Sequence, residues 1–308
     1  MTDDGRWSRR RLLKVGLGGA AVLVVGGATG VELVTHGVLP GKATLDELDG
    51  ACSVAHPALS YGPLGPSISG TFASRARHRA VGYTIAYPRG HGPGSLLPLI
   101  VMLHGFGADH TTALVGMSPA QAMALRVDGS PIAPMALVTV DGGGGYWHAH
   151  RGDDPMDMIV NELIPLCQGS GLGVEPQRIG VMGISMGGYG ALLLAETYPD
   201  RFAAAAVISP AVWTDYDQAR STNRGAFSSA ESFRANDVIL AAGRLSRRPV
   251  RIATGIDDPF HPGVVALAKV VPTDTTVVIS TGCHTGAFFA SQEPPSLGFL
   301  SRHLPVAV

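Results

Sequence analysis

A serine flanked by glycines is the clearest chemical signal in this chain. Residues 183–187 read Gly-Ile-Ser-Met-Gly, which fits the pattern G-x-S-x-G around Ser185. Residues 178–182 before them contain a short apolar run typical of a buried strand, and residues 188–198 after them favour a helix that Pro199 ends. A strand, a sharp turn and a helix expose the serine Oγ at the carboxyl end of the strand. The sequence therefore predicts a nucleophile at this position.

A serine nucleophile needs a base that accepts its proton and a carboxylate that orients this base. With this motif, the acid and then the histidine follow the serine along the chain. Residues 250–255 predict a strand that ends in a glycine. Asp258 follows this glycine by three residues, the usual spacing of the acid with this motif, so we prefer Asp258 to Asp257. Residues 276–280 predict the next strand, and His284 lies in the loop behind it. These two residues are predicted to complete a triad with the serine.

The oxyanion of a tetrahedral intermediate requires two preorganised N–H groups. The backbone N–H of Met186, directly after the nucleophile, is the first candidate. Residues 99–103 predict an earlier strand, and the loop behind it offers the N–H of Phe106, with Gly107 as the second choice. His104 in the same loop is expected to brace it by hydrogen bonding.

Aromatic residues beyond the predicted strands are candidates for contact with a substrate. Tyr146 and Trp147 follow the predicted strand at residues 136–140. Trp213 lies near the start of a polar, irregular segment, residues 211–247, in which further aromatic side chains are interspersed. Two interpretations of this segment stay open: a helix pair packed on the sheet, or a small cap whose aromatic side chains line an acyl pocket.

Strand and helix patterns alternate from residue 99 onward. The expected strands are residues 99–103, 136–140, 178–182, 203–209, 250–255 and 276–280, and the expected helices include residues 119–127, 155–167 and 188–198. This alternation predicts the α/β class, with a mostly parallel central sheet and helices on both faces. Residues 68–73 and 81–87 are expected to add an antiparallel hairpin at the edge of this sheet. Ligands bind beyond the carboxyl ends of such strands, where the predicted triad lies.

With these residues placed, the chain resembles the α/β-hydrolases, and within them the esterase group that includes esterase D and the mycolyltransferases. The resemblance covers roughly residues 65–305. It is carried by the motifs at residues 104–107, 141–147, 161–165, 183–191, 255–260 and 282–284. It implies an α/β-hydrolase fold and acyl-ester chemistry through an acyl-enzyme on Ser185, Asp258 and His284. The mycolyltransferases carry a glutamate as the triad acid, so the aspartate favours a plain esterase.

The leading prediction is therefore a serine esterase that hydrolyses a small-molecule or lipid ester without a cofactor or a metal ion. Acyl transfer of the mycolyltransferase type is one alternative, and a non-catalytic, envelope-anchored binding protein on the same fold is another. A third is metal-dependent hydrolysis at His148, His150, Asp153 and Asp154. We rank the metal site last, because an aspartate followed by Pro155 fits the start of a helix equally well.

Composition and length limit the organisation of the chain. The formal net charge is −1 and no basic stripe is present, so a nucleic-acid partner is not expected. The 308 residues are long enough for one α/β domain of about 240 residues and an N-terminal extension. We predict a signal or membrane anchor over residues 1–34, a linker over 35–65 and the catalytic domain over 66–308.

The N-terminus carries the strongest localisation signal. Residues 8–14 read Ser-Arg-Arg-Arg-Leu-Leu-Lys, which fits the twin-arginine export pattern, and residues 15–31 are uncharged. Export of the catalytic domain is expected, by a signal or by an uncleaved anchor that would associate it with the membrane or cell envelope. Three cysteines leave at least one unpaired, and Cys52 has two candidate disulfide partners, Cys283 and Cys167.

Overall fold

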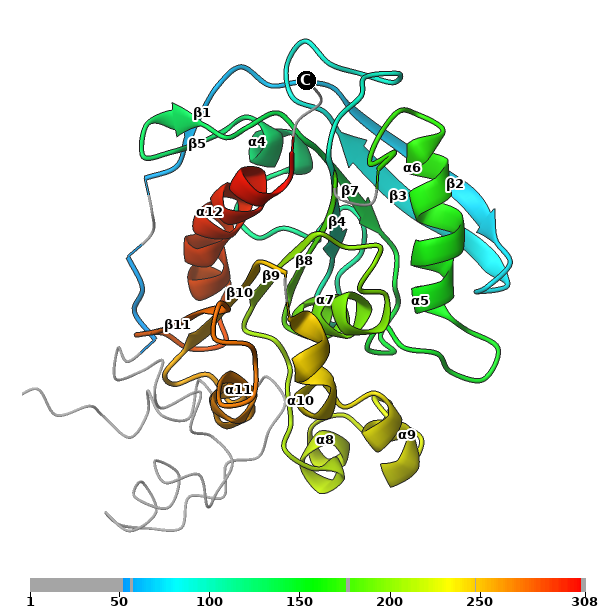
Figure 1. Ribbon diagram of the computed structural model, residues 1–308, viewed down its shortest axis with the longest axis vertical. Coiled ribbons are helices and arrows are strands. Elements are labelled where there is room, and N and C mark those ends of the chain that lie inside the picture. Colours follow the sequence, from blue (N-terminus) through cyan, green and yellow to red (C-terminus); the bar gives the residue numbers. More distant parts are fainter. Residues whose placement is uncertain (1–51, 56–57, 176–177, 247, 306–308) are drawn as a thin grey trace, which may run out of the picture. The chain divides into compact units, whose positions relative to one another are not determined.

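The computed structural model describes residues 52–55, 58–175, 178–246 and 248–305 (Figure 1). The chain divides into two compact units, Met1–Ala51 and Cys52–Val308, and the predicted signal or anchor lies outside the described residues. The second unit begins before the predicted boundary at residue 66. Part of the expected linker thus belongs to this unit, because Ser60 and Tyr61 pair with a strand of the domain.

An eight-stranded sheet forms the centre of the second unit (Figure 1). Its spatial order is β11-β10-β9-β8-β4-β7-β3-β2. The strands are β2 (Ser67–Ser74), β3 (Arg79–Ala86), β4 (Leu99–Leu103), β7 (Ala136–Val140), β8 (Ile179–Ile184), β9 (Ala204–Ile208), β10 (Val250–Gly255) and β11 (Thr276–Ser280). Strand β3 is antiparallel to both of its neighbours, and the strands from β7 to β11 in this order are parallel. The predicted parallel sheet and its edge hairpin are confirmed.

Helices cover both faces of the sheet (Figure 1). They are α4 (Pro119–Met123), α5 (Pro155–Met158), the π-helical turn η1 (Ile159–Leu163), α6 (Ile164–Gln168), α7 (Met186–Thr197), α8 (Tyr216–Thr222), α9 (Ala230–Ala235), α10 (Val238–Ala241), the 3-10 turn η3 (Ala242–Leu245), α11 (His261–Ala268) and α12 (Gly286–His303). Among the described residues, no helix is both long enough and apolar enough to span a membrane.

The two faces carry separate hydrophobic clusters, because successive side chains of a strand point to opposite sides. All five residues of β4 are buried. Leu99, Val101 and Leu103 pack in one cluster with residues of α5, α6, α7 and α11. Ile100 and Met102 pack in the other with residues of α4 and α12. Burial on both faces explains why the central strands are continuous apolar runs.

The helix predicted over residues 119–127 is shorter than expected. Ser118 starts it with a capping box, but α4 ends at Met123. The following residues form β5 (Leu125–Val127), which pairs with β1 (Ser60–Tyr61) and with β6 (Ser130–Pro131) in a small antiparallel sheet. Pairing with β1, a segment distant in sequence, outweighs the local helical pattern here.

Candidate active site

Ser185 stands in the turn between β8 and α7. Its φ of 57° and ψ of −118° lie in a region that is strained for a residue with a side chain. A Cβ added to Gly183 would clash with the carbonyl oxygen of Gly187, and one added to Gly187 would clash with that of Leu103. The turn therefore requires glycine on both sides of the serine, as the motif predicts.

Three residues from separate loops meet at this turn. The Ser185 Oγ lies 2.8 Å from Nε2 of His284, and the opposite ring nitrogen, Nδ1, lies 2.9 Å from Oδ2 of Asp258. These distances fit a hydroxyl that donates to Nε2 and an N–H that donates to the carboxylate. The structure thus brings together the nucleophile, base and acid predicted from the sequence.

Asp258 is the acid that contacts the histidine. Its side chain is fully buried, Oδ2 accepts from His284, and Oδ1 accepts the backbone N–H of Phe260 at 2.8 Å. Two donors compensate a carboxylate that has left water. The backbone N–H of Asp257 instead donates to the carbonyl of Gly282 at 3.0 Å. The predicted preference between the two aspartates agrees with this geometry.

The two predicted oxyanion donors lie beside the serine. Met186 is the first residue of α7, where a backbone N–H has no acceptor within its own helix. A Cβ added to Gly105 would lie 3.7 Å from the Ser185 Cβ, so the loop that contains Phe106 runs next to the nucleophile. In the described part of the chain, neither Met186 nor Phe106 uses its N–H in a hydrogen bond. Both groups are therefore available for an oxyanion.

His104 braces this loop, as expected. Its ring is buried, Nε2 accepts the N–H of Gly142 at 2.9 Å, and Nδ1 donates to the carbonyl of Gly105 at 2.7 Å. Burial lowers the pKa of His104. The neutral imidazole can donate from one nitrogen and accept at the other, which is what these two contacts require.

The predicted aromatic substrate contacts lie in the core instead. Trp147 is completely buried, packs against Gly190 and donates its indole N–H to the carbonyl of His104 at 3.3 Å. Tyr146 and Trp213 are 4% and 5% exposed, and their ring centroids are 5.1 Å apart. Burial in the core argues against substrate contact for all three side chains, most strongly for Trp147.

The segment over residues 211–247 consists of short helices packed into the same core. Three of its aromatic side chains, Trp213, Phe227 and Phe233, are buried and belong to the hydrophobic cluster that contains α7, and Tyr216 is partly buried against it. The ring centroids of Phe227 and Phe233 lie 5.1 Å apart in an edge-to-face contact. Mutual packing of this kind favours the helical interpretation over a cap that lines an acyl pocket.

Two phenylalanines missed by the sequence analysis flank the histidine. The ring centroids of Phe260 and Phe289 lie 5.0 and 4.9 Å from that of His284, both edge-on. Phe106 adds an exposed ring on the oxyanion loop. Their closeness in sequence to Asp258, His284 and His104 was the one signal that could have identified them. Rings that meet in space need not share a sequence motif.

The residues of the metal site that we ranked last among the alternatives have protein partners. Nε2 of His148 lies 2.7 Å from the carbonyl of Ala226, and Nε2 of His150 lies 2.7 Å from that of Gly145. The carboxylate of Asp153 pairs with Arg77. Asp154 accepts the N–H of Asp157 and caps α5, with Pro155 in the first turn. In the residues that the structure covers, no group of metal-binding side chains converges.

Comparison with known sequences identifies the family. The family model described as "putative esterase" matches residues 74–260. The chain belongs to this esterase family. The resemblance inferred from the motifs is thus confirmed, and the matched stretch contains Ser185 and Asp258. No curated protein sequence matches the chain.

Solved structures show the same fold at low sequence identity. A ferulic acid esterase is 17% identical with a TM-score of 0.64, and the match covers 78% of this chain and 98% of that one. The S-formylglutathione hydrolase from Agrobacterium tumefaciens is 15% identical with a TM-score of 0.62, covering 80% and 99%. Mycobacterium tuberculosis MPT51 (FbpC1) is 15% identical with a TM-score of 0.60, covering 78% and 100%. This chain therefore has the α/β-hydrolase fold.

Proposed function

We propose that this esterase-family member is a serine hydrolase that cleaves carboxylic esters through an acyl-enzyme on Ser185. The observation that carries the proposal is the hydrogen-bonded series of Ser185, His284 and Asp258 at the strained turn before α7. A nucleophile, a base within 2.8 Å and an orienting acid are the parts that acyl transfer requires. The Met186 and Phe106 N–H groups complete the arrangement.

The geometry supports a two-step reaction. Nε2 of His284 takes the proton of Ser185 as its Oγ attacks the ester carbonyl, and the two N–H groups stabilise the oxyanion. The imidazolium, oriented by Asp258, then returns the proton to the leaving alcohol. Water attacks the acyl-enzyme in the second step, with the same histidine as the base. Acid and alcohol are released, and the serine is regenerated.

The comparisons support an ester as the substrate. The family is one of esterases, and two of the similar structures are a ferulic acid esterase and an S-formylglutathione hydrolase. Asp258 in the acid position favours hydrolysis over transfer of the mycolyltransferase type. A small-molecule or lipid ester is therefore the proposed substrate class.

The decisive test is hydrolysis of nitrophenyl esters with short and long acyl chains by the full-length protein. We expect turnover that falls by about 1,000-fold or more in Ser185→Ala, because the triad acts as a unit. Ser228→Ala, at an exposed position, is the matched control and should retain activity. Equal rates for the Ser185 variant and the wild type would contradict the proposal. Absence of turnover on every ester would favour acyl transfer to a specific acceptor, or a non-catalytic binding protein.

We further propose that the domain is exported, either as a secreted protein or anchored in the envelope. The twin-arginine pattern over residues 8–14 supports this, and so does a disulfide bond between Cys52 and Cys283, because disulfides persist in oxidising compartments. In a host with twin-arginine transport, the full chain should reach the cell envelope or medium. An Arg9→Lys, Arg10→Lys variant should stay in the cytoplasm. Cytoplasmic retention of the unaltered chain would refute export.

A further inference from the structure

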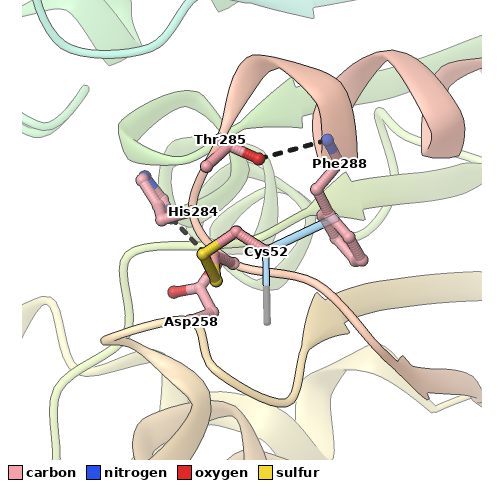
Figure 2. The surroundings of a disulfide bond; sticks show 6 residues. Cys52, Asp258, His284, Thr285 and Phe288 are labelled. Carbon is pink, nitrogen blue, oxygen red and sulfur yellow. Dashed lines mark hydrogen bonds and ion pairs between the residues drawn. A yellow bond between two sulfur atoms is a disulfide. The ribbon is translucent and has the colours of Figure 1, made fainter. Parts of the chain in front are cut away.

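A disulfide bond joins the start of the described chain to the loop of the proposed base (Figure 2). Cys283 directly precedes His284 and is bonded to Cys52, which lies 231 residues earlier in the sequence. Both cysteines are buried, with 9% and 3% exposure. Figure 2 shows the bond between the two sulfur atoms beside His284 and Asp258. Cys52 is thus attached to the residue that directly precedes the proposed base.

The loop over residues 281–285 has little support from the sheet. It leaves β11, which is an edge strand and pairs with β10 on one side. The loop after β10 gives it one backbone hydrogen bond, from the Asp257 N–H to the carbonyl of Gly282, and the side chain of His284 adds its hydrogen bonds to Asp258 and Ser185. At its far end, Thr285 caps α12 by accepting the N–H of Phe288. The position of His284 therefore depends on its own side-chain contacts and on what holds the residues just before it.

The segment around Cys52 supplies this support. A Cβ added to Gly282 would lie 3.1 Å from Cγ2 of Val54, so this valine lies against the loop as well as being linked to it through the disulfide. Val54 also packs against the hydrophobic cluster that contains Phe288 of α12. The covalent bond and this contact hold the loop against Cys52 and Val54, next to the start of α12.

We propose that the Cys52–Cys283 disulfide is a positioning device for His284, and that the enzyme reaches full activity only when this bond has formed. The inference rests on the proposed function. Reduction would release the loop while the sheet, the turn around Ser185 and Asp258 keep their own contacts. The hydrogen bonds of 2.8 and 2.9 Å at the two ring nitrogens would then lose their alignment. Esterase activity would remain low in a reducing compartment and rise after export.

The redox step needs an external partner. When the bond forms, the two thiols lose two protons and two electrons to the disulfide of a thiol–disulfide oxidoreductase, which becomes a dithiol. Dithiothreitol reverses the step: the protein S–S bond breaks, Cys52 and Cys283 each gain a hydrogen, and the reagent closes to its cyclic disulfide.

The test measures kcat and KM of the full-length protein on nitrophenyl acetate, when oxidised, after dithiothreitol, and after reoxidation with oxidised glutathione. Thiols counted in denaturant report complete reduction. We expect kcat to fall by about tenfold to 100-fold with little change in KM, because misplacement of a catalytic group by about 1 Å has this size of effect. Reoxidation should restore it.

Two variants separate positioning from other roles. Cys52→Ser leaves the His284 loop unaltered in sequence and should show the low kcat of the reduced enzyme, without further response to reductant. Cys167→Ser, at the buried free cysteine, is the matched control and should respond like the wild type. Circular dichroism at the assay temperature follows the folded state.

Each outcome decides between the proposals. Unchanged kcat in a fully reduced, folded enzyme would overturn the positioning role while leaving the proposed esterase function intact. Activity loss that parallels loss of the folded circular dichroism signal would assign the bond to stability and overturn it too. An oxidised protein that neither hydrolyses esters nor reacts with a serine-directed phosphonate would contradict the esterase function itself, and the positioning proposal with it.

Discussion

Contacts at both ring nitrogens and with two phenylalanine rings hold the histidine of the proposed triad. Nδ1 donates to Asp258, which leaves Nε2 free of a proton and able to accept from Ser185. Phe260 and Phe289 contact the ring edge-on and restrict its rotation. The tautomer required of a general base is thus set by a single carboxylate.

Asp258→Asn should lower kcat by about 10,000-fold on nitrophenyl esters, because the amide can present an N–H to Nδ1 and favour the wrong tautomer. The size of the side chain is nearly unchanged, so the protein should still fold. Asp257→Asn is the matched control, one residue away, and should lose far less activity. Steady-state kinetics of both variants check the assignment. A larger loss for the Asp257 variant would show that the neighbouring aspartate is the acid.

At the scale of elements, the nucleophile depends on the close approach of β8, α7 and β4. Strands β4 and β8 are neighbours in the parallel sheet, and the turn after β8 passes directly over the end of β4. Gly187 lies at this crossing, where a side chain would meet the carbonyl oxygen of Leu103. A backbone atom cannot move aside as a flexible side chain can, so the turn around Ser185 tolerates no larger residue at this position.

Gly187→Ala should therefore lower both stability and activity. We expect about 1–3 kcal/mol of destabilisation from overpacking, and a fall in kcat as the serine shifts. Gly243→Ala is the matched control, since a Cβ there meets no atom within 4 Å among the described residues, and stability should be unchanged or slightly higher. Denaturant unfolding and ester hydrolysis measure the two effects. Wild-type stability and kcat in the Gly187 variant would refute the crossing as a constraint.

At the scale of the whole molecule, two carboxyl groups are buried far from the proposed chemistry. Glu196 in α7 is 1% exposed, and among the described residues neither of its oxygens has a hydrogen-bond partner. Burial, with a smaller contribution from Asp237, raises the pKa of Glu196 to about 9. Burial likewise raises the pKa of Glu293 in α12 to about 8, opposed by the N–H of Val115. With these pKa values, protonation of both carboxyl groups is favoured at pH 7 in the folded protein.

This burial makes stability depend on pH. Above the ordinary glutamate pKa of 4.5, the unfolded chain releases the proton that Glu196 keeps in the folded chain. The contribution of Glu196 to the free energy of unfolding is therefore highest below pH 4.5 and is lost as the pH rises toward 9. The slope is at most about 1.4 kcal/mol per pH unit. Glu196→Gln should remove this contribution, because the amide stays neutral. The variant should gain thermal stability over the wild type progressively between pH 5 and pH 8.

Thermal unfolding of both proteins across this pH range measures the effect. Glu231→Gln, at an exposed position on α9, is the control and should follow the wild type at every pH. A stability difference between Glu196→Gln and the wild type that does not grow with pH would show that Glu196 is ionised in the folded protein.

Local sequence patterns were enough to predict the strands of the central sheet, the turn around Ser185 and the candidates for base, acid and oxyanion donors. These features follow from local patterns: apolar runs of strand length, glycines at a tight turn, and functional residues directly behind strands. Parallel strands place their carboxyl ends on one edge of the sheet, so residues far apart in sequence could be expected to meet there.

The pairing of distant segments became visible only in the folded chain. The tertiary structure selected Cys283 over Cys167 as the partner of Cys52, ended the helix at Met123 in favour of strand pairing with β1, and buried Trp147 in the core. Such outcomes depend on which surfaces the folded chain brings into contact. A local pattern gives the type of a residue and its neighbours in sequence, whereas burial and disulfide pairing depend on neighbours in space.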